Sequence, residues 1–498
     1  MKVNFLKIIS VLILLLIVNI GCKKDQNVTN VTLDKNNITL DIEETATLKA
    51  TVYPEDAANK AVNWTSSNSA VADVVNGIVT AKEVGETTIT VITEDGNFTA
   101  ECIVTVTPEW PPLGMTGSGT IENPWQINTA DHLRTLSLYV NARNGDATIG
   151  QYYKLMNDID LIKFNNWEPI GKGIYYSQDF QGNFNGNGKT IKNLTINSST
   201  GSWIGLFGSI KSAEIENLCL EHCYVNGENM YAVSGLVGES YHSTISNCFV
   251  SGEIVGYRAG MLVGQMTGTT VAYCYSSGNV NGRSCGGLVG NSTHYCGSGL
   301  IYNKIFNCYS TCVVNGEGQV GGLVGYNEKD CSISNSYATG KVTASGNSVG
   351  GLVGSNYGTI SYCHAKGTVK GYDHVGGLIG YSDGCIVNCV AANDSVISKV
   401  RWKSVNRIAG YSSYCGCAGN YANINMIILN SEGLITIIEP WYTSESGIGK
   451  NMSTLRSRDF YTTTDNWCNE AWDMTSVWDI ENGKGLPFLR KKANLIGA

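Results

Sequence analysis

Cysteine and histidine are the residues of this 498-residue chain with the most reactive side chains, and the chain holds 17 cysteines. The run Cys415-Gly416-Cys417 could bind a metal ion together with Cys385 or with His294-Tyr295-Cys296. These spacings do not match those of structural zinc sites, and the chain lacks the His-Glu-x-x-His sequence of zinc peptidases. We therefore expect no metal and no cofactor, and loop thiols or a disulfide at Cys415 and Cys417.

Asp158 and Asp160 form an acidic pair that could do chemistry. In a strand, residues two positions apart share one face, where two carboxylates could bind calcium or act as acid and base. No third partner is visible, and the Gly-Gly-x-Gly-x-Asp repeats of calcium-binding solenoids are missing. We expect a structural use for this pair and no catalytic residue in the chain.

Five cysteines occupy one position of a repeated segment: Cys248, Cys274, Cys308, Cys363 and Cys389. Earlier copies carry Leu194 and Leu218 there, which predicts a column of small, buried side chains. Neighbouring copies would hold their Cα atoms about 4.8 Å apart, a distance that a disulfide accepts. Cys248–Cys274 and Cys363–Cys389 are thus alternative bridges. We favour free buried thiols, because side chains in register point parallel to one another.

The next position along carries an aromatic column that should face outward: Phe249, Tyr275, Tyr309, Tyr337 and His364. Such rings could form a flat strip that contacts sugar faces or a protein. The alternative, which we favour, is a ladder that only stabilises adjacent coils. A second candidate contact is the insertion between Gly290 and Ile305, which contains His294 and Tyr295.

The segment that positions these columns ends in the sequence Val-Gly-Gly-Leu-Val-Gly and its variants. The closing glycines are spaced by 30, 26, 26, 35, 29 and 26 residues, at Gly208, Gly238, Gly264, Gly290, Gly325, Gly354 and Gly380. Such units cannot bury a core alone, but stacked coils of a parallel β-solenoid can. Roughly ten coils would make a rod on the order of 50 Å long.

Two details of the coil follow from strand alternation. The first apolar residue of the segment lies three positions before Leu194, so the chain must bend at Asn193, and asparagine tolerates the left-handed conformation of such a corner. The glycines of the motif allow close packing between layers. Alternation does not explain how both Leu352 and Val353 are buried.

The motif, with Pro124-Trp125-Gln126-Ile127 and Phe180-Gln181-Gly182-Asn183-Phe184 before it, resembles the GLUG-motif proteins. These are bacterial cell-surface proteins, and the motif also occurs in some IgA-cleaving metallopeptidases, whose zinc motif is missing here. Residues 27–107 alternate in eight short apolar runs and resemble the bacterial immunoglobulin-like domain, group 2, through Val62-Asn63-Trp64-Thr65-Ser66-Ser67 and Gly77-Ile78-Val79-Thr80-Ala81. The resemblance implies a spacer, with Trp64 in its core.

The N-terminus resembles a bacterial lipoprotein signal. Lys2 and Lys7 precede an apolar run from Ile8 to Ile20, and Gly21-Cys22 follows. The resemblance implies cleavage before Cys22 and a lipid anchor on its thiol. Lys23-Lys24-Asp25 resembles a tract that directs some lipoproteins to the cell exterior.

Charged residues are only 15% of the chain and the net charge is −8, which gives no basic surface for nucleic acid. We expect an all-β protein: an immunoglobulin-like sandwich, then a right-handed parallel β-helix with a C-terminal cap. The expected parts are a signal (1–22), the Ig-like domain (27–107), a linker (108–118), first coils (119–204), GLUG repeats (205–390), degenerate coils (391–440) and the cap (441–498).

These features predict a non-catalytic, adhesin-like or ligand-binding protein, anchored by lipid in the outer membrane and exposed at the surface. Its ligand would be a glycan or a host or cell-surface protein. The alternatives are a polysaccharide lyase or glycoside hydrolase on a β-helix, which would need clustered carboxylates or basic residues, and a purely structural surface element.

Overall fold

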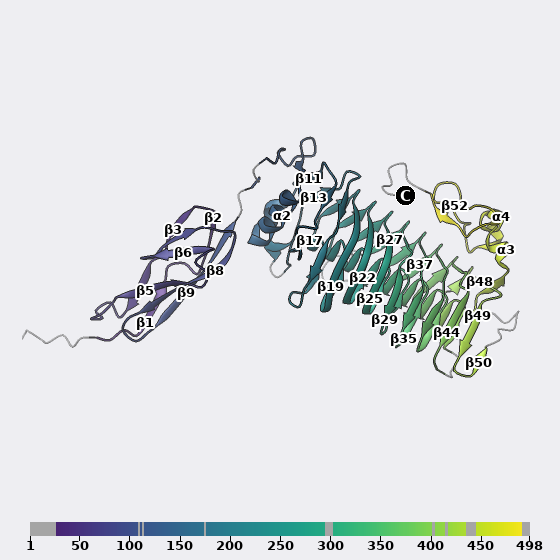
Figure 1. Ribbon diagram of the computed structural model, residues 1–498. Helices are drawn as coiled ribbons and strands as arrows, with labels where there is room; N and C mark the ends of the chain where they lie inside the picture. The colour runs from purple at the N-terminus through teal and green to yellow at the C-terminus, as the bar shows by residue number, and fades with distance from the viewer. Residues whose placement is uncertain are drawn as a thin grey trace, which may run out of the picture. The chain divides into compact units, whose positions relative to one another are not determined.

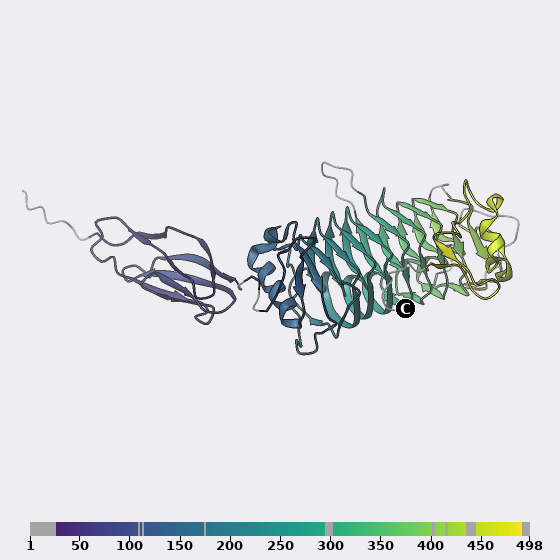
Figure 2. The same cartoon turned by 90° about the horizontal axis from the view of Figure 1, so that it is seen from above.

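The structure is a computed structural model that describes residues 26–107, 110–111, 114–173, 176–293, 302–400, 404–413, 417–434 and 445–490. The chain divides into two compact units, Met1–Glu109 and Trp110–Ala498 (Figures 1 and 2). The expected signal, including Cys22, lies outside the described residues. Among those that are described, no helix is long and apolar enough to cross a membrane.

The first unit is a β-sandwich of nine strands. Eight of them coincide with the eight apolar runs that the sequence predicts as strands, and β3 is the additional one. They are β1 (Asn30–Leu33), β2 (Asn37–Asp41), β3 (Thr45–Thr47), β4 (Ala50–Tyr53), β5 (Val62–Ser66), β6 (Ala72–Val75), β7 (Ile78–Ala81), β8 (Gly85–Thr93) and β9 (Thr99–Thr107). The sheets run β2-β9-β8-β5 and β3-β7-β6, with β1 paired to β4. Alternate residues of β8 are buried, as the sequence pattern predicts. Trp64 is half-buried against this core, and Cys102 is fully buried in it.

The second unit is a β-solenoid built from three sheets of stacked strands (Figure 1). Sheet I has 11 strands: β10 (Trp125–Ile127), β11 (Tyr152–Leu155), β13 (Asn183–Asn185), β18 (Glu214–Glu216), β21 (Thr244–Ser246), β24 (Thr270–Ala272), β27 (Lys304–Phe306), β32 (Ser332–Ser334), β37 (Thr359–Ser361), β42 (Cys385–Val387) and β47 (Cys417–Ala418). Sheet III has eight: β17 (Phe207–Lys211), β20 (Val237–Tyr241), β23 (Val263–Thr267), β26 (Val289–Thr293), β31 (Val324–Asn327), β36 (Val353–Asn356), β41 (Ile379–Ser382) and β46 (Ala409–Ser412).

Sheet II lies between them along each coil and has 23 strands. They are β12 (Ile159–Asp160), β14 (Thr190–Lys192), β15 (Thr195–Asn197), β16 (Trp203–Ile204), β19 (Cys219–Ser234), β22 (Phe249–Gly260), β25 (Tyr275–Gly286), β28 (Tyr309–Ser310), β29 (Val313–Gly316), β30 (Val320–Gly321), β33 (Tyr337–Ala338), β34 (Val342–Ala344), β35 (Asn347–Gly350), β38 (His364–Ala365), β39 (Val369–Gly371), β40 (Asp373–Gly376), β43 (Val390–Ala391), β44 (Ser395–Ser398), β45 (Val405–Asn406), β48 (Tyr421–Asn423), β49 (Ile427–Asn430), β50 (Gly433–Leu434) and β51 (Ile448–Lys450). Neighbouring coils pair in parallel, whereas β49 and β50 form an antiparallel pair.

The corner between sheets I and II confirms the predicted bend. Its residue has a positive φ, between 46° and 55°, in seven coils: Asn217, Asn247, Tyr273, Asn307, Asn335, Tyr362 and Asn388. Asn193 also has a positive φ, of 59°, but it lies between β14 and β15 within sheet II, so the prediction that Leu194 belongs to the column of Leu218 is wrong. Asparagine is among the few non-glycine residues that adopt this conformation readily. The bend turns the following cysteine or leucine into the core.

The corner between sheets II and III explains why Leu352 and Val353 are both buried. β35 ends at Gly350 and β36 begins at Val353, so Leu352 lies in the bend of the corner and Val353 in the strand after it, and strand alternation does not apply between them. Both side chains are fully buried. Their N–H groups both donate to the carbonyl oxygen of Leu378 in the next coil, at 2.8 and 3.0 Å. A Cβ on Gly351 would lie 2.1 Å from the carbonyl oxygen of Gly377, so the corner requires glycine.

The N-terminal end of the solenoid carries a helix that the sequence analysis did not anticipate. Helix α2 (Ala130–Tyr139) begins after Thr129, whose side chain accepts a hydrogen bond from the His132 N–H. It continues as a π-helix (Val140–Asn144) and a 3₁₀ helix (Gly145–Thr148). Leu133 and Leu136 are fully buried in the solenoid core, so α2 contributes directly to that core.

The C-terminal segment contains α3 (Met452–Leu455), α4 (Arg458–Thr462), a 3₁₀ turn (Thr464–Asn466) and the hairpin β52 (Trp478–Asp479) with β53 (Phe488–Leu489). The first described residues of the expected cap stack on the last coil: the Ile408 N–H donates to the Glu445 carbonyl oxygen at 2.9 Å, and β51 pairs with β48. The rest of the segment does not cover the end of the core but packs on the outward face of sheet II. Its aromatic cluster includes Val390 and Tyr421 and is separate from the solenoid core.

Candidate ligand-binding surface

The aromatic column forms one continuous stack on the outward face of sheet II. Parallel pairing places each ring directly over its equivalent in the next coil. From Phe249 to His364 the ring centroids are 4.5, 5.0, 4.9 and 4.7 Å apart, and the last three pairs lie within 9° of parallel. This spacing follows from the strand separation of about 4.8 Å.

The stack leaves little ring surface for a ligand. The faces of Tyr275, Tyr309 and Tyr337 are covered by the rings above and below, so a sugar could reach only their edges and hydroxyl groups. Tyr275 is 8% exposed and His364 only 1%. Phe249, Tyr309 and Tyr337 are half-buried. The column is therefore a stacked ladder and not an open strip, and His364 is not accessible as a contact residue.

The C-terminal segment covers the far end of this stack. His364 Nε2 lies 2.8 Å from the Pro487 carbonyl oxygen, and its ring contacts Trp478 at a centroid distance of 5.7 Å. Asn388, a corner residue, donates to the Cys468 carbonyl oxygen and accepts from the Cys468 N–H, both at 2.8 Å. The corner side chains and the end of the aromatic column thus form the docking site of the C-terminal segment.

Burial in this docking site affects the titratable groups of the stack. Desolvation lowers the pKa of His364 to about 4, and the contact with the Pro487 carbonyl only partly offsets this. Burial also raises the pKa of Tyr309 and Tyr337. The imidazole is therefore neutral and the phenols are protonated at neutral pH.

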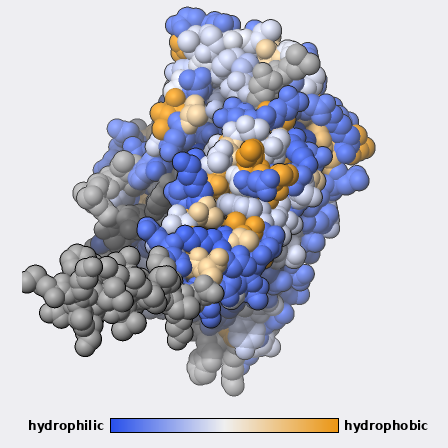
Figure 3. All heavy atoms as spheres, turned by 90° about the vertical axis from the view of Figure 1, so that its left-hand side faces the viewer, coloured by the Kyte–Doolittle hydropathy of each residue, from blue (hydrophilic) through white to orange (hydrophobic). Residues whose placement is uncertain are grey.

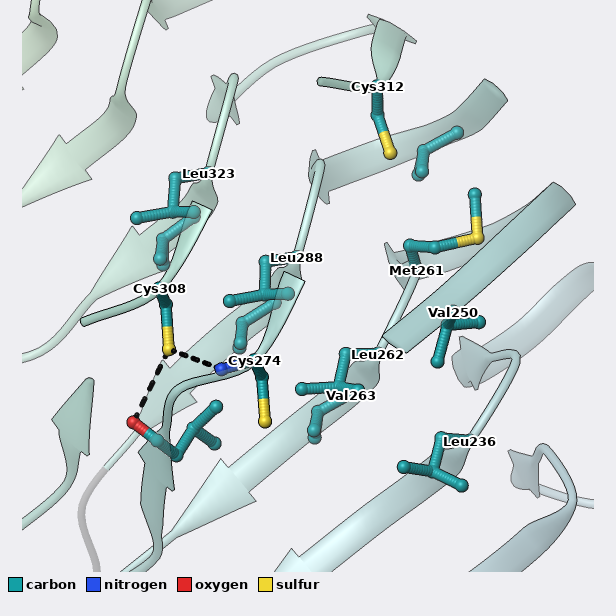
Figure 4. Close-up of a cluster of buried hydrophobic side chains, with 14 of the residues drawn as sticks. Leu236, Val250, Met261, Leu262, Val263, Cys274, Leu288, Cys308, Cys312 and Leu323 are labelled. Atoms are coloured by element: carbon teal, nitrogen blue, oxygen red, sulfur yellow. Dashed lines mark hydrogen bonds between the residues drawn. The ribbon is translucent and has the colours of Figure 1, made fainter. Parts of the chain in front are cut away.

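The five cysteines of the inward column are buried free thiols, so the alternative bridges Cys248–Cys274 and Cys363–Cys389 are not formed. Each thiol is within hydrogen-bonding distance of a carbonyl oxygen at its own corner; Cys308 Sγ lies 3.2 Å from that of Phe306. Cys308 Sγ also accepts from the Cys274 N–H at 3.4 Å, as Figure 4 shows. Desolvation raises the pKa of Cys248, Cys274 and Cys363, which makes them poor nucleophiles.

Asp158 and Asp160 have structural roles. The Asp158 carboxylate accepts from the Thr190 N–H at 2.9 Å, and that of Asp160 accepts from Asn193 Nδ2 and the Ile162 N–H, also at 2.9 Å. The Asn193 contact, then that of Ile162, lowers the pKa of Asp160. Across the described ranges no three His, Cys, Asp or Glu side chains gather as a metal site. His294, Tyr295, Cys296, Cys415 and Cys22 lie outside the described residues.

Two buried carboxyl groups on the outward side of the coils escaped the sequence analysis. Glu239 is 2% exposed and Asp179 is 4% exposed. Burial raises the pKa of Glu239 to about 7, although hydrogen bonds from Tyr241 and Gln265 partly oppose it, and burial also raises the pKa of Asp179. Glu239 follows the closing glycine Gly238, at a position that carries Ser209 and Gln265 in the neighbouring coils, so no repeated carboxylate gave a signal in the sequence.

Comparisons with known proteins agree with this architecture. Residues 27–104 match the bacterial Ig-like domain (group 2), and residues 316–343 and 345–370 match the GLUG motif. The chain carries a bacterial Ig-like domain and GLUG motifs. Both resemblances drawn from the sequence are thereby confirmed, and the two GLUG matches are consecutive, the first running from the end of β29 into β34 and the second from β35 into β39.

Several curated proteins are similar to parts of the chain. It is 36% identical over 140 residues (27% of this chain, 15% of the relative) to the "Putative Gly-rich membrane protein" of Evansella cellulosilytica. It is 32% identical over 150 residues (28% and 2%) to "Halomucin" of Haloquadratum walsbyi. It is 46% identical over 81 residues (16% and 31%) to the "Ig-like virion protein" of Serratia phage KSP90. The chain thus spans no more than 15% of the length of the first two relatives.

A solved structure described as that of a "putative immunoglobulin A1 protease" of Bacteroides ovatus is also similar. The similarity covers 75% of this chain and 94% of that one, at 20% identity and a TM-score of 0.43. At this score it carries no argument about activity.

Proposed function

We propose that this protein is a lipid-anchored component of the bacterial cell surface that binds a ligand without altering it. The Ig-like unit serves as the spacer and the solenoid as the binding element. The matched domains, and relatives named as a membrane protein, a halomucin and a virion protein, support a surface location. The predominantly hydrophilic face in Figure 3 suits exposure to water.

The observation that carries the binding role is a row of aligned outward positions on sheet III. Parallel register places eight residues in line: Ser209, Glu239, Gln265, Asn291, Tyr326, Ser355, Tyr381 and Tyr411. Five of them are at most 9% exposed: Ser209, Glu239, Gln265, Asn291 and Ser355. The rings and hydroxyl groups of the other three, Tyr326, Tyr381 and Tyr411, are accessible and can recognise a polar ligand by stacking and hydrogen bonding. A flat, regular row of this kind favours an extended ligand.

The lipid anchor is tested by Cys22→Ser in cells fed an alkyne-labelled fatty acid. The unchanged chain should take up the label and resist release from membranes by salt, and the variant should do neither. Protease treatment of intact cells then tests exposure. An unlabelled chain, or one that intact cells fully protect, would contradict the proposal at that step.

The ligand is sought by applying the purified chain without its signal to an array of glycans and cell-surface proteins. Variants Tyr275→Ala, Tyr309→Ala and Tyr337→Ala test the stacked column of sheet II. We expect them to lower the stability of the solenoid and to leave ligand affinity unchanged, because the rings present only edges. Loss of binding by a well-folded Tyr309→Ala variant would instead make the column the binding surface.

Glu239 and Asp179 favour a second candidate function, a carbohydrate-active enzyme, because both carboxyl groups have raised pKa values. A general acid of a glycosidase needs such a shift. Their exposures of 2% and 4% leave no room for a substrate in this arrangement, so we rank this function second. Release of sugar products that stops in Glu239→Gln would reverse that order.

A further inference from the structure

A second aromatic surface lies on sheet III, in the four coils that contain β31, β36, β41 and β46. In each coil the first and third residues after the glycine that closes the motif lie two apart and share the outward face. The pairs are Tyr326 with Glu328, Ser355 with Tyr357, Tyr381 with Asp383, and Tyr411 with Ser413. Every coil therefore offers one phenol ring, and three of the four also offer a carboxylate or hydroxyl group; in the coil of β36 the hydroxyl is that of Ser355, which is buried.

Backbone pairing keeps both rows in register. Tyr326, Ser355, Tyr381 and Tyr411 are direct strand partners. Beyond the strands, the N–H of Tyr357 donates to the Asn327 carbonyl oxygen at 2.8 Å, and that of Asp383 to the Asn356 carbonyl oxygen at 2.9 Å. The surface is therefore as rigid as the solenoid that carries it.

The rings of this surface are arranged differently from the stack on sheet II. Tyr326 and Tyr357 are 5.5 Å apart at 46°, and Tyr357 and Tyr381 are 5.8 Å apart at 41°. Only Tyr381 and Tyr411 approach a parallel stack, 5.4 Å apart at 15°. Tyr411 is 41% exposed, and the other three rings are half-buried. Tilted rings do not cover one another fully, and the His374 ring also contacts those of Tyr381 and Tyr411, at centroid distances of 5.9 and 5.4 Å.

Polar groups lie beside the rings. The Tyr326 hydroxyl donates to Glu328 Oε2 at 3.1 Å, and the Ser413 hydroxyl donates to Asp383 Oδ1. Burial, followed by the nearby Glu328 carboxylate, raises the pKa of Tyr326, so its phenol stays protonated at neutral pH. The carboxylates retain further lone pairs that can accept hydrogen bonds from hydroxyl groups.

We propose that this tyrosine surface (Tyr326, Glu328, Tyr357, Tyr381, Asp383 and Tyr411) binds a neutral glycan chain that runs along the solenoid axis. The C–H faces of the sugars would lie on the rings, and their hydroxyl groups would donate to the two carboxylates. These carboxylates and the chain's net charge of −8 repel anionic glycans, so charge selects a neutral one. The inference rests on the proposed function and names its ligand class and site.

The proposal also predicts where the binding surface ends. In the preceding coils the position of Tyr326 is taken by Asn291, Gln265 and Glu239, whose exposures are 4%, 9% and 2%. Aromatic contact therefore begins at β31. A bound oligosaccharide should protect the coils from β31 to β46 from hydrogen exchange and leave β20 and β23 unchanged.

The test uses the double variant Tyr381→Ala/Tyr411→Ala on an array that carries neutral, uronic-acid and sulfated glycans. Tyr372→Ala is the matched control, because Tyr372 is also exposed, at 49%, and lies outside the tyrosine surface. We expect the full chain to bind a neutral glycan. The double variant should weaken this binding by at least about tenfold, and the control should leave it unchanged.

The other outcomes are distinct. Binding of a neutral glycan that the double variant leaves intact would overturn the tyrosine surface and leave the proposed function standing. Binding of anionic glycans alone would overturn the ligand class. Binding of proteins alone would overturn the glycan inference and still support a ligand-binding function. A chain that binds no member of any class would overturn both. Unchanged thermal unfolding of the double variant confirms that it is folded.

Discussion

Glu239 is a carboxyl group held out of water by the stacked coils, and its ionisation should destabilise the solenoid. Its pKa is raised to about 7 in the folded chain, from a usual value near 4.5. Between these values the folded state binds more protons than the unfolded state, so stability falls as the pH rises through this window. Below pH 4.5 both states are protonated and the effect vanishes.

We therefore expect Glu239→Gln to stabilise the solenoid at pH 8 by about 1–3 kcal/mol and to change nothing at pH 4. Urea unfolding followed by tryptophan fluorescence at both pH values measures the difference. Equal stability of the two proteins at pH 8 would show that Glu239 has a more favourable environment than the structure gives it.

His364 has the opposite pH dependence. Its pKa is lowered to about 4 in the folded chain, from 6.5, so below pH 6.5 the unfolded state takes up the proton first. Stability is complete above pH 6.5 and is lost by about 2–3 kcal/mol as the pH falls to 4. Because His364 contacts Trp478, the C-terminal segment should detach first, with a change in tryptophan fluorescence.

His364→Phe keeps a flat ring beneath Trp478 and cannot be protonated. It should lack the acid transition between pH 6.5 and 4, although losing the contact with Pro487 costs about 1 kcal/mol at neutral pH. An acid transition that persists unchanged in this variant would assign the event to other groups.

At the scale of the coil, the corner between sheets I and II decides both columns. Its left-handed residue ends one sheet, and the thiol that follows hydrogen-bonds to the corner carbonyl oxygen. In the coil after Cys308 a serine takes the place of the cysteine and makes the same hydrogen bonds. Ser336 Oγ donates to the Ser334 carbonyl oxygen at 2.7 Å and accepts from the Cys308 N–H at 3.1 Å.

The natural serine at the equivalent position of the next coil predicts which substitutions Cys308 tolerates. Cys308→Ser should be nearly neutral, because a hydroxyl can make the same hydrogen bonds. Cys308→Ala should cost about 1–2 kcal/mol through the lost sulfur volume and hydrogen bonds. Thermal unfolding ranks the variants. A serine variant that is less stable than the alanine variant would contradict the hydrogen-bonding role of the thiol.

The corner residue Asn307 has φ of 54°. We expect Asn307→Gly to be tolerated and Asn307→Val to cost about 2 kcal/mol or more, since a β-branched residue is strongly disfavoured in this conformation. Circular dichroism melts of the two variants provide the comparison. Equal melting of the glycine and valine variants would show that the backbone relaxes out of the left-handed region.

Elements that repeat could be predicted from the sequence, and elements that occur once could not. The period fixes the coil, and the offset of three between Ile215 and Leu218 marks the corner between sheets I and II. Ile191 and Leu194 have the same offset but flank a second bend within sheet II. Helix α2 was missed although Leu133, Leu136 and Val140 follow a helical spacing behind Thr129. The docking of the C-terminal segment has no local signal, because Trp478 contacts Asn335 across 143 positions of the chain.

The candidate site shows the same division. The sequence predicted which aromatic residues share a column, and the structure places them in one stack. The sequence could not show that the rings cover one another's faces, because this depends on the angle between neighbouring rings. The tyrosines of sheet III were not singled out, because serine interrupts their row at position 355 and Tyr357 supplies the ring from the neighbouring row.

At the scale of the whole molecule, the chain is an Ig-like domain followed by a β-solenoid that displays aligned polar and aromatic rows. The stack on sheet II holds the coils and the C-terminal segment together, and in the proposed function sheet III is the face that contacts the ligand. The matched domains confirm this order along the chain, Ig-like domain first and GLUG coils after it.

The central claim, binding without chemistry, is tested most directly by recovering the ligand. The full chain is incubated for hours with an excess of the glycan that it binds most tightly, and the glycan is then analysed by mass spectrometry. We predict that every recovered molecule keeps its original mass while the chain remains saturated. Shortened or unsaturated products that accumulate with time, and that disappear with Glu239→Gln, would contradict the account and identify an enzyme.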